Sequence, residues 1–231
     1  MIPILQRESC TPESPLRVAV LASGQGTNLQ ALIDYTRQHK CCFQIEAVVT
    51  NKSHAPALER AANHQIPAHC VPHMSFPNRE AFEEEMIAQL SAYDIELVVL
   101  AGFMRVLTPT FIDRFPNRII NVHPALCPSF PGIHAPAQAL NHGCMITGCT
   151  VHIVDSGVDT GPILAQAAVL IQPGDAEEAL SKRIQEREHA LLPAVIDQIA
   201  RGLVRFENGS IVRQISDSIT GVTSGNESLN K

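Results

Sequence analysis

Hydrophobic and polar residues alternate along the first half of the chain in two repeating patterns. Short apolar runs rich in Val, Leu and Ile predict buried strands, and longer amphipathic stretches predict helices. The predicted strands are residues 16–22, 45–50 and 95–101, and the predicted helices are residues 29–38, 55–64 and 79–92. Strands that alternate with helices in this way pair in parallel through right-handed crossovers.

The second half of the chain continues this pattern and then changes it. Residues 119–122 predict a further strand, and residues 149–154 and 163–171 predict a β pair late in the sheet. Residues 175–201 predict one long helix, with Asp175 as its cap and Gly202 as its stop. Together these elements predict an α/β domain with a doubly wound, mostly parallel sheet and helices on both faces. Ligands of such sheets bind beyond the carboxyl ends of the strands.

The two ends of the chain lack the periodicity of its middle. Residues 1–15 contain three prolines, and residues 208–231 are rich in Ser, Gly and Asn. We therefore expect a loose N-terminal leader at 1–15, one domain at 16–207 and a disordered tail at 208–231. The total of 231 residues suits a single full-sized domain.

Charge and cysteine content narrow the classes of function. The formal net charge is −6, so nothing in the composition predicts binding to nucleic acid or to a membrane surface. No apolar run approaches the roughly 18 residues of a membrane span. The seven cysteines are scattered, and none has the spacing of a zinc or disulfide framework. This predicts reduced thiols in the cytoplasm and no metal.

The most informative chemistry lies at the end of the strand predicted for residues 119–122. Asn121 and His123 stand two positions apart, so their side chains share one face of the strand. Three prolines and a glycine follow within ten residues and predict a rigid loop. An amide beside an imidazole suits a reaction that builds charge on a carbonyl oxygen.

A glycine-rich segment joins the first predicted strand to the first predicted helix. In Ser23-Gly-Gln-Gly-Thr-Asn28, backbone N–H groups could approach an anion at the helix start. Leu29 stands at the third glycine position of a dinucleotide fingerprint, and Thr50-Asn51-Lys52 replaces its acidic residue. The segment therefore favours a single phosphate monoester over NAD, with an ordinary tight turn as the alternative.

Four motifs together resemble the 10-formyltetrahydrofolate-dependent formyltransferases, and among them the phosphoribosylglycinamide formyltransferases. The motifs are Leu21-Ala-Ser-Gly-Gln-Gly-Thr-Asn28, Ala101-Gly-Phe-Met-Arg-Val-Leu107, Asn121-Val-His-Pro with its Pro-Ser-Phe-Pro-Gly loop, and Gly148-Cys-Thr-Val-His-Ile-Val154 with Val158-Asp-Thr-Gly161. The resemblance covers residues 17–202 in the family's order. It implies the formyltransferase fold and transfer of a formyl group from 10-formyltetrahydrofolate, a cosubstrate, to the amine of 5-phosphoribosylglycinamide in de novo purine synthesis.

The resemblance also assigns roles to single residues. It implies a catalytic set of Asn121, His123 and Asp159, in which the carboxylate holds the imidazolium and orders a water for proton transfer. The ribonucleotide would lie against Gly26, Thr27, Asn28, Gln185 and Glu188. The folate would contact Arg79, Met104, Arg105, Val106, Leu107, Asn121, Asp155, Ser156, Gly157, Val158 and Asp159. The implied partners are these small molecules, with no metal, nucleic acid or membrane, and the protein would be a monomer or a homodimer.

Other interpretations stay open at this point. Asp159 lies in an Asp-x-Gly sequence typical of a turn, and His152 alternates with Val151 and Ile153 as an ordinary strand residue. Gln185 and Glu188 also suit a solvated helix face. The alternative functions are another folate-dependent formyltransferase, a formyltetrahydrofolate deformylase, or a non-enzymatic nucleotide-binding module. The last of these leaves the catalytic set without a purpose.

The loop after His123 departs from the family in two places. Ser129 stands where the family often has a basic residue, and Ala135-Pro-Ala-Gln138 stands where it often has His or Arg. Both departures affect substrate contacts more than the catalytic set.

Overall fold

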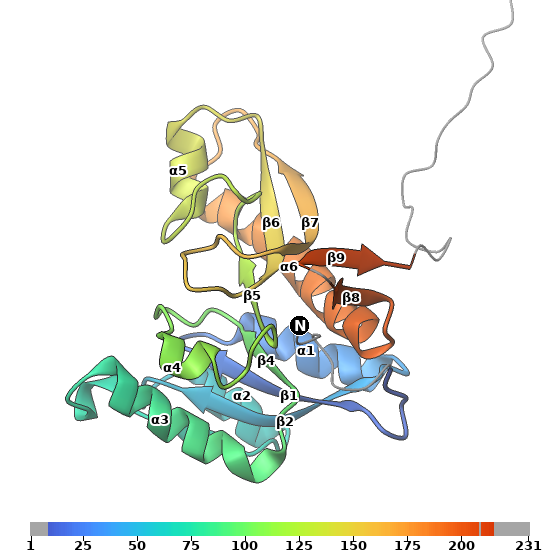
Figure 1. The fold of residues 1–231 in the computed structure, drawn as a ribbon. Helices are drawn as coiled ribbons and strands as arrows, with labels where there is room; N and C mark the ends of the chain where they lie inside the picture. The colour runs from blue at the N-terminus through green and yellow to red at the C-terminus, as the bar shows by residue number, and fades with distance from the viewer. Residues whose placement is uncertain (1–8, 208, 215–231) are drawn as a thin grey trace, which may run out of the picture.

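A seven-stranded sheet forms the centre of the computed structural model, which describes residues 9–207 and 209–214 (Figure 1). Its strand order is β3-β2-β1-β4-β5-β6-β7. The first five strands in this order are parallel, whereas β6 runs antiparallel to β5 and β7 antiparallel to β6. The strands are β1 (Leu16–Ala22), β2 (Phe43–Thr50), β3 (Ala68–Cys70), β4 (Leu97–Leu100), β5 (Ile119–His123), β6 (Ile146–Ile153) and β7 (Ile163–Leu170).

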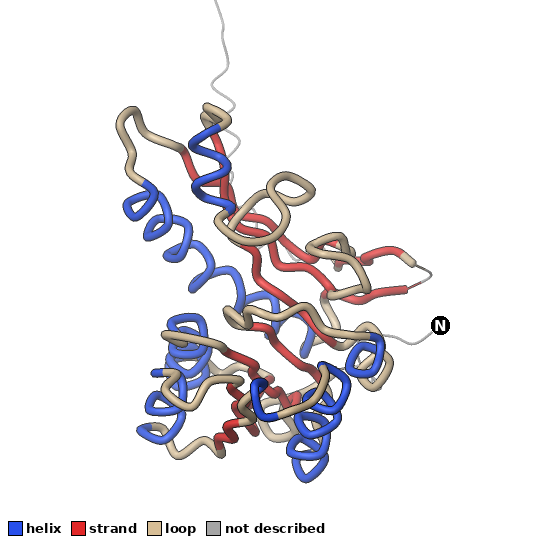
Figure 2. The backbone as a smooth tube through the Cα atoms, turned by 90° about the vertical axis from the view of Figure 1, so that its left-hand side faces the viewer, coloured by secondary structure: helices blue, strands red, loops and turns tan. Residues whose placement is uncertain are grey.

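Helices cover both faces of this sheet. The α-helices are α1 (Thr27–Gln38), α2 (Pro56–Asn63), α3 (Arg79–Leu90), α4 (Pro109–Ile112), α5 (Ala135–Asn141) and α6 (Glu177–Ala200). Two short 3₁₀ helices, η1 (His73–Ser75) and η2 (Ser91–Tyr93), flank α3. Figure 2 shows α6 as a long helix that runs along one side of the sheet. The predicted doubly wound, mostly parallel sheet with helices on both faces is confirmed.

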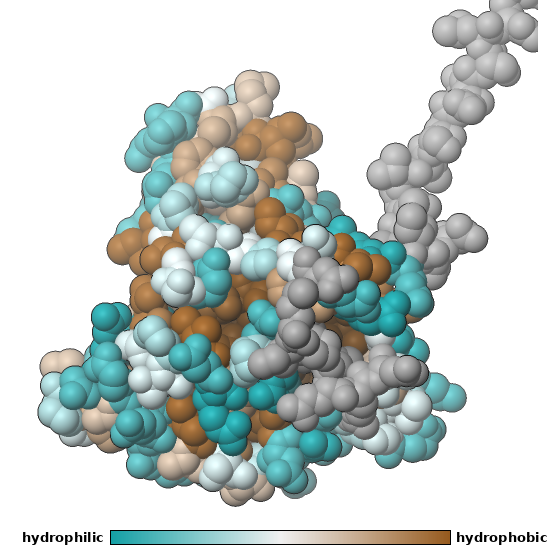
Figure 3. Space-filling view, viewed as in Figure 1, coloured by the Kyte–Doolittle hydropathy of each residue, from teal (hydrophilic) through white to brown (hydrophobic). Residues whose placement is uncertain are grey.

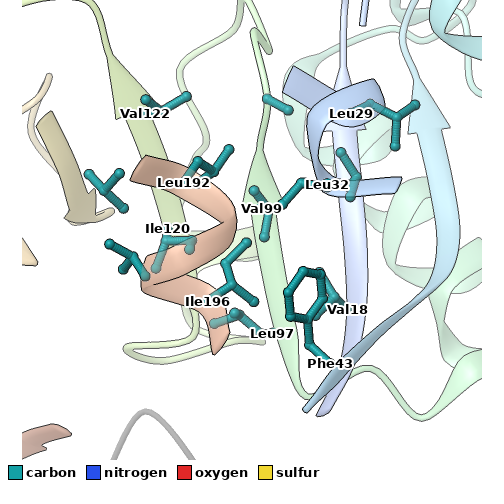
Figure 4. Close-up of a cluster of buried hydrophobic side chains, with 14 of the residues drawn as sticks. Val18, Leu29, Leu32, Phe43, Leu97, Val99, Ile120, Val122, Leu192 and Ile196 are labelled. Carbon is teal, nitrogen blue, oxygen red and sulfur yellow. The ribbon is translucent and has the colours of Figure 1, made fainter. Parts of the chain in front are cut away.

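The core has one layer on each face because the central strands are buried on both sides. In β1, Val18 and Val20 belong to the layer beneath α1 and α6, and Ala19 and Leu21 belong to the layer beneath α3. Figure 4 shows the first layer, where Leu192 and Ile196 of α6 pack over the sheet beside residues of α1. This two-sided burial holds the strands in register and so fixes where their carboxyl ends lie.

Besides the two 3₁₀ helices, four elements were not expected from the sequence. These are the short edge strand β3, helix α5, and the two strands of a hairpin, β8 (Val204–Glu207) and β9 (Ser210–Arg213). The prediction that Asp175 caps the long helix is wrong. Ala176 is the N-cap residue, and the Asp175 carboxylate accepts from Arg183 Nη1 at 2.9 Å and from the Gln172 backbone N–H at 2.7 Å. Gly202, with φ of 72°, follows the end of α6 as predicted.

Parts of the predicted leader and tail contact the domain. The buried Cys10 donates its backbone N–H to Ala200 O at 2.6 Å, and β9 pairs with β8 beyond the predicted boundary at residue 207. Residues 1–8, 208 and 215–231 of these segments lie outside the described residues. The domain boundaries therefore stay a prediction. Within the described ranges, no helix has both the length and the apolar character needed to cross a membrane.

Candidate active site

Loops from three parallel strands meet at the point where the strand order reverses, between β1 and β4. Ser23, after β1, donates its backbone N–H to Gly102 O at 3.1 Å, and its Oγ accepts from Met104 N at 2.8 Å. His123 ends β5, the next strand beyond β4. The glycine segment, the segment after β4 and the Asn-x-His pair are therefore joined at one edge of the sheet.

The glycine segment is fixed from behind by α2. Arg60 Nε donates to Gln25 O at 2.7 Å, and Ala57 N donates to Gly24 O at 3.2 Å. Gly26 has φ of 68°, and a Cβ added there would lie 2.8 Å from Ala57 Cβ. Both the left-handed φ and the contact with α2 therefore favour glycine at position 26. The outcome is a preformed loop whose other side faces a cavity.

Helix α6 supplies the opposite wall of that cavity. Gln185 Nε2 donates to Thr27 Oγ1 at 3.0 Å, and Asn28 Nδ2 donates to Glu188 Oε2 at 2.8 Å. The structure thus brings together the five residues proposed for the ribonucleotide. They line a cavity of about 400 Å³, here called the glycine-loop cavity, together with Ser23, Gly24, Gln25, Lys52, Ala101, Gly102, Met104, Val122, Pro124, Pro136 and Ser181.

The carboxyl of Glu188 is buried among these groups and is only 7% exposed as a residue. Burial raises the pKa of Glu188 above its ordinary value, and the hydrogen bond from Asn28 opposes that shift. Asn28 Oδ1 is buried and has no hydrogen-bond partner among the described residues. A buried acceptor of this kind favours a ligand that carries hydroxyl or N–H donors.

Asn121, His123 and Asp159 lie together at the end of β5. His123 Nδ1 is 3.3 Å from Asp159 Oδ2, and Asn121 Nδ2 donates to Asp159 Oδ1 at 3.3 Å. His123 Nε2 lies 2.8 Å from Phe130 O, so a doubly protonated ring could donate to a carboxylate and to a carbonyl. The structure places Asp159 beside His123, across 36 residues of chain, and the catalytic roles of the three residues stay a prediction.

The environment of Asp159 favours its ionised form. Burial raises the pKa of this carboxyl, but hydrogen bonds from His152 and Gly132 N, with the charges of His123 and His152, outweigh burial and lower it below 3.8. Gly132 N donates at 2.8 Å, so the proline-rich loop itself holds the carboxylate. The result is an anion fixed beside the His123 imidazole.

His152 belongs to this cluster, although the sequence favoured an ordinary strand residue. Its Nε2 lies 3.5 Å from Asp159 Oδ1 and 3.2 Å from Asn121 Nδ2, and the residue is 2% exposed. It reaches this place because Asn121 and His152 are direct partners in the antiparallel β5–β6 register. The alternation of Thr150 and His152 in β6 was the available signal, but it indicates the right face only once the register is known.

A second cavity, of about 550 Å³, includes His123 in its lining, adjoins the glycine-loop cavity and is here called the apolar cavity. Apolar side chains dominate its rim, and Met104, Val106, Ile133 and Val158 are each between 44% and 71% exposed. Figure 3 shows hydrophobic residues gathered in a hollow between the part carrying β6 and the part carrying α4. Most of the residues proposed for the folate line it: Met104, Arg105, Val106, Leu107, Asn121, Asp155, Gly157, Val158 and Asp159.

Two of the proposed folate residues lie elsewhere in the described part of the chain. Arg79 is exposed at the start of α3, just after the Asn78 cap, and Ser156 is exposed in the loop after β6; neither lines the apolar cavity. Their roles stay predictions.

A residue missed by sequence reasoning, Glu83 of α3, anchors the segment that lines this cavity. It is 1% exposed, and its carboxylate accepts from Thr108 N at 2.9 Å and also from Thr108 Oγ1.

The described residues contain no cluster of side chains suited to bind a metal ion. Across 9–207 and 209–214, no group of three or more His, Cys, Asp or Glu side chains is placed to hold an ion. All seven cysteines lie in the described part of the chain and are free thiols.

The fold and this polar cluster between two cavities define a class of protein. Residues 16–196 match the family described as formyl transferase, and the chain therefore belongs to that family. Within it, the chain is 40% identical over 195 residues to phosphoribosylglycinamide formyltransferase of Escherichia coli, covering 84% of this chain and 92% of that protein.

A longer relative and a solved structure are similar in the same region. The chain is 47% identical over 191 residues to the trifunctional purine biosynthetic protein adenosine-3 of Drosophila pseudoobscura, covering 82% of this chain but only 14% of that protein. The crystal structure of glycinamide ribonucleotide transformylase 1 from Symbiobacterium toebii matches with a TM-score of 0.84 and 41% identity, covering 87% of this chain and 95% of that one.

Proposed function

We propose that this protein transfers a formyl group from 10-formyltetrahydrofolate to the amine of 5-phosphoribosylglycinamide, a step of de novo purine synthesis in the cytoplasm. One observation carries the proposal above all. The Asn121, His123 and Asp159 cluster lines the apolar cavity next to the wall, including Val122 and Pro124, that this cavity shares with the glycine-loop cavity. A phosphorylated amine, which accepts the formyl group, and a flat aromatic folate, which donates it, would therefore meet beside this cluster of acid-base groups.

The glycine-loop cavity suits the phosphorylated amine. Backbone N–H groups at the start of α1 favour an anion, and α2 holds the loop in place before any ligand arrives. The Asn28 and Glu188 side chains offer acceptors for ribose hydroxyl groups. Lys52 also lines this cavity and adds a positive charge for the phosphate.

The apolar cavity suits the folate. A ring system buried between Met104, Val106, Leu107 and Val158 would gain hydrophobic contact, and backbone groups of the same segment could bond its polar edge. Glu83 would preserve the shape of that segment from the far side.

The chemistry follows from the cluster. The neutral amine attacks the formyl carbon, a C–N bond forms, and the formyl oxygen gains negative charge. Asn121 and protonated His123 stabilise that oxyanion. To accept a hydrogen bond from His123 Nε2–H, the oxyanion must replace the Phe130 carbonyl oxygen as its acceptor. Asp159 holds the imidazolium and helps a water carry the amine proton to N10. The bond from the formyl carbon to N10 then breaks and releases tetrahydrofolate and the formylated amine.

The test is incubation of the purified protein with 10-formyltetrahydrofolate and one acceptor at a time: 5-phosphoribosylglycinamide, methionyl-tRNA, or none. We expect stoichiometric tetrahydrofolate and formylated phosphoribosylglycinamide only with the first acceptor. Formate release without an acceptor would identify a deformylase, and formylated tRNA would identify a different formyltransferase. Saturable binding of both ligands without any turnover would indicate that the protein is a non-enzymatic binding module, and it would overturn the proposal.

A further inference from the structure

A second polar cavity lies at the opposite end of the sheet from the candidate active site. It has a volume of about 250 Å³ and is lined by the start of β1, the end of α3, η2, the residues before β4, and the connection from α4 to β5. Arg17, Leu90, Glu96, Arg114, Phe115 and Arg118 define it, and it is here called the amino-edge cavity. Because β1, β4 and β5 begin here and the catalytic loops follow their carboxyl ends, this cavity is separate from the site described above.

Arg118 is the unusual residue of this cavity. It is 8% exposed, and its Nε atom is buried without a hydrogen-bond partner among the residues that the structure describes. Nη2 makes one long bond, donating to Arg114 O at 3.3 Å. The turn at Asn117, with φ of 59°, and the bond from Arg118 N to Phe115 O at 2.9 Å hold the residue at this position. A buried guanidinium donor without an acceptor is costly unless an anion satisfies it.

Positive charge is concentrated around this guanidinium. The guanidinium carbons of Arg114 and Arg118 each lie 5.6 Å from the centre of the Phe115 ring. Burial lowers the pKa of Arg118, and the charge of Arg114 adds to that shift, whereas Glu96 opposes it. The surroundings therefore disfavour the charged form, and an added anion would relieve both effects.

One of the two acidic groups of the cavity, Glu96, is engaged by Arg17. The Glu96 carboxylate accepts from Arg17 N at 3.1 Å and lies 3.5 Å from Arg17 Nη1. Asp94 accepts from Arg17 Nε through its backbone oxygen at 2.8 Å. Three guanidinium groups and two carboxylates thus line the cavity, which leaves an excess of one positive charge.

We propose that the amino-edge cavity binds phosphate, or the phosphate end of a small phosphate ester, with Arg114 and Arg118 as its ligands. Planar guanidinium forks match the oxygen spacing of phosphate, and several N–H groups can bond one tetrahedral anion. The cavity has less than half the volume of the apolar cavity, so a folate does not fit it. An anion bound by these two arginines of the α4–β5 connection would stabilise the folded state through binding linkage. The proposal does not depend on the formyl transfer reaction.

The test is a titration of the ¹⁵N-labelled full-length protein with inorganic phosphate, with chloride added to keep the ionic strength constant. We expect two separate sets of saturable amide shifts, one at residues 24–28 and one at residues 115–119. Arg114→Gln, at an exposed position, should weaken the second affinity about tenfold, the loss of one charge-assisted bond, and should leave the first unchanged. Arg37→Gln, at another exposed arginine, is the matched control and should change neither.

The possible outcomes distinguish free phosphate from a phosphate ester as the ligand, and they show whether the proposal fails. A parallel titration with ribose 5-phosphate identifies an ester if it binds the amino-edge cavity more tightly than phosphate does, and free phosphate otherwise. Absence of saturable shifts at residues 115–119 with both ligands would overturn the proposal. So would an Arg114→Gln protein, shown to be folded by its spectrum, that binds there as tightly as the wild type.

Discussion

The two cavities beside His123 differ in how the chain fixes them. The glycine-loop cavity is fixed through the main chain of its loop, because Ala57 N and the Arg60 side chain of α2 donate to the carbonyls of Gly24 and Gln25. The apolar cavity is lined by exposed side chains such as Met104 and Val158, and one buried carboxylate anchors its wall. The first can therefore recognise a small charged group with little rearrangement, and the second can adapt to a large flat ring.

This difference matters because the catalytic cluster lies next to the wall that the two cavities share, where both ligands would meet. The two cavities share Gly102, Met104, Val122 and Pro124, so a change in that wall would alter both ligands. A change in the contact with α2 should alter binding in the glycine-loop cavity alone, and a change in α3 should alter binding in the apolar cavity alone. Substitutions at these positions therefore test whether the two cavities are independent.

The largest effect is expected where the cavities meet. His123→Ala and Asp159→Asn should each lower kcat for formyl transfer at least about 100-fold, because each removes part of one acid-base unit. The double variant should lose little more than either single variant. Steady-state kinetics would measure kcat, and calorimetry would show that both substrates still bind.

The control for this pair is His54→Ala, at an exposed histidine outside both cavities. It should keep wild-type kcat. Nearly normal turnover in Asp159→Asn would end the supporting role proposed for that carboxylate, whatever the effect at His123.

The next largest effect should appear on the nucleotide side alone. Gly26→Ala places a Cβ 2.8 Å from Ala57 Cβ at a φ of 68°, so the loop must move away from α2. We expect the Kd for phosphoribosylglycinamide to rise about tenfold or more, the equivalent of about 1.4 kcal/mol, while the Kd for the folate is retained. Calorimetry with each ligand separately would measure both.

Gly143→Ala is the matched control, since Gly143 has φ of 67° but no heavy atom within 4 Å of the added Cβ. It carries the same left-handed strain of about 1–2 kcal/mol without the collision. If Gly26→Ala weakened both ligands equally, a general folding defect would explain the result better than a displaced loop.

These two sites also show what the sequence can and cannot predict. Six of the seven strands, the glycine segment and the Asn-x-His pair are local patterns of periodicity and spacing, and the structure has strands where these six were predicted but adds the unexpected edge strand β3. One reason for Gly26, its left-handed φ, is local, but the second is not. It depends on Ala57, 31 residues away in α2, and nothing in the glycine motif names that neighbour.

The rest of the candidate site depends on pairing between distant segments. His152 joins the cluster because of the β5–β6 register, and a shift of one residue would turn it to the other face. Glu83 lies in a helix with three consecutive glutamates, of which only this one is buried against Thr108. Asp175 is a residue type that often caps helices, but its carboxylate accepts instead from Arg183, two turns later in α6. Local composition cannot decide such competitions.

A smaller effect is expected from Glu83, on the folate side alone. Glu83→Gln leaves one Thr108 donor without a good acceptor, because the amide has a single oxygen where two carboxylate oxygens accept now. The Kd for the folate should rise several-fold, about fivefold, and the free energy of unfolding should fall by about 1–3 kcal/mol. The nucleotide Kd should not change.

The neighbouring Glu84→Gln is the control, because Glu84 is exposed in the same helix turn. Its folate affinity and urea midpoint should match the wild type. Loss of nucleotide binding in Glu83→Gln would contradict the independence of the two cavities.

The smallest effect concerns the stability contributed by Glu188. Burial raises the pKa of this carboxyl above 4.5 in the folded state, so the folded protein binds its proton more tightly than the unfolded chain does. Below pH 4.5 the carboxyl is neutral in both states, and as the pH rises through the raised folded value, the ionised group increasingly disfavours the folded state. Glu188→Gln should therefore match the wild type in urea midpoint near pH 4 and exceed it at pH 7, while it weakens nucleotide binding. Equal midpoints at both pH values would show that the bond from Asn28 already offsets the cost of burial.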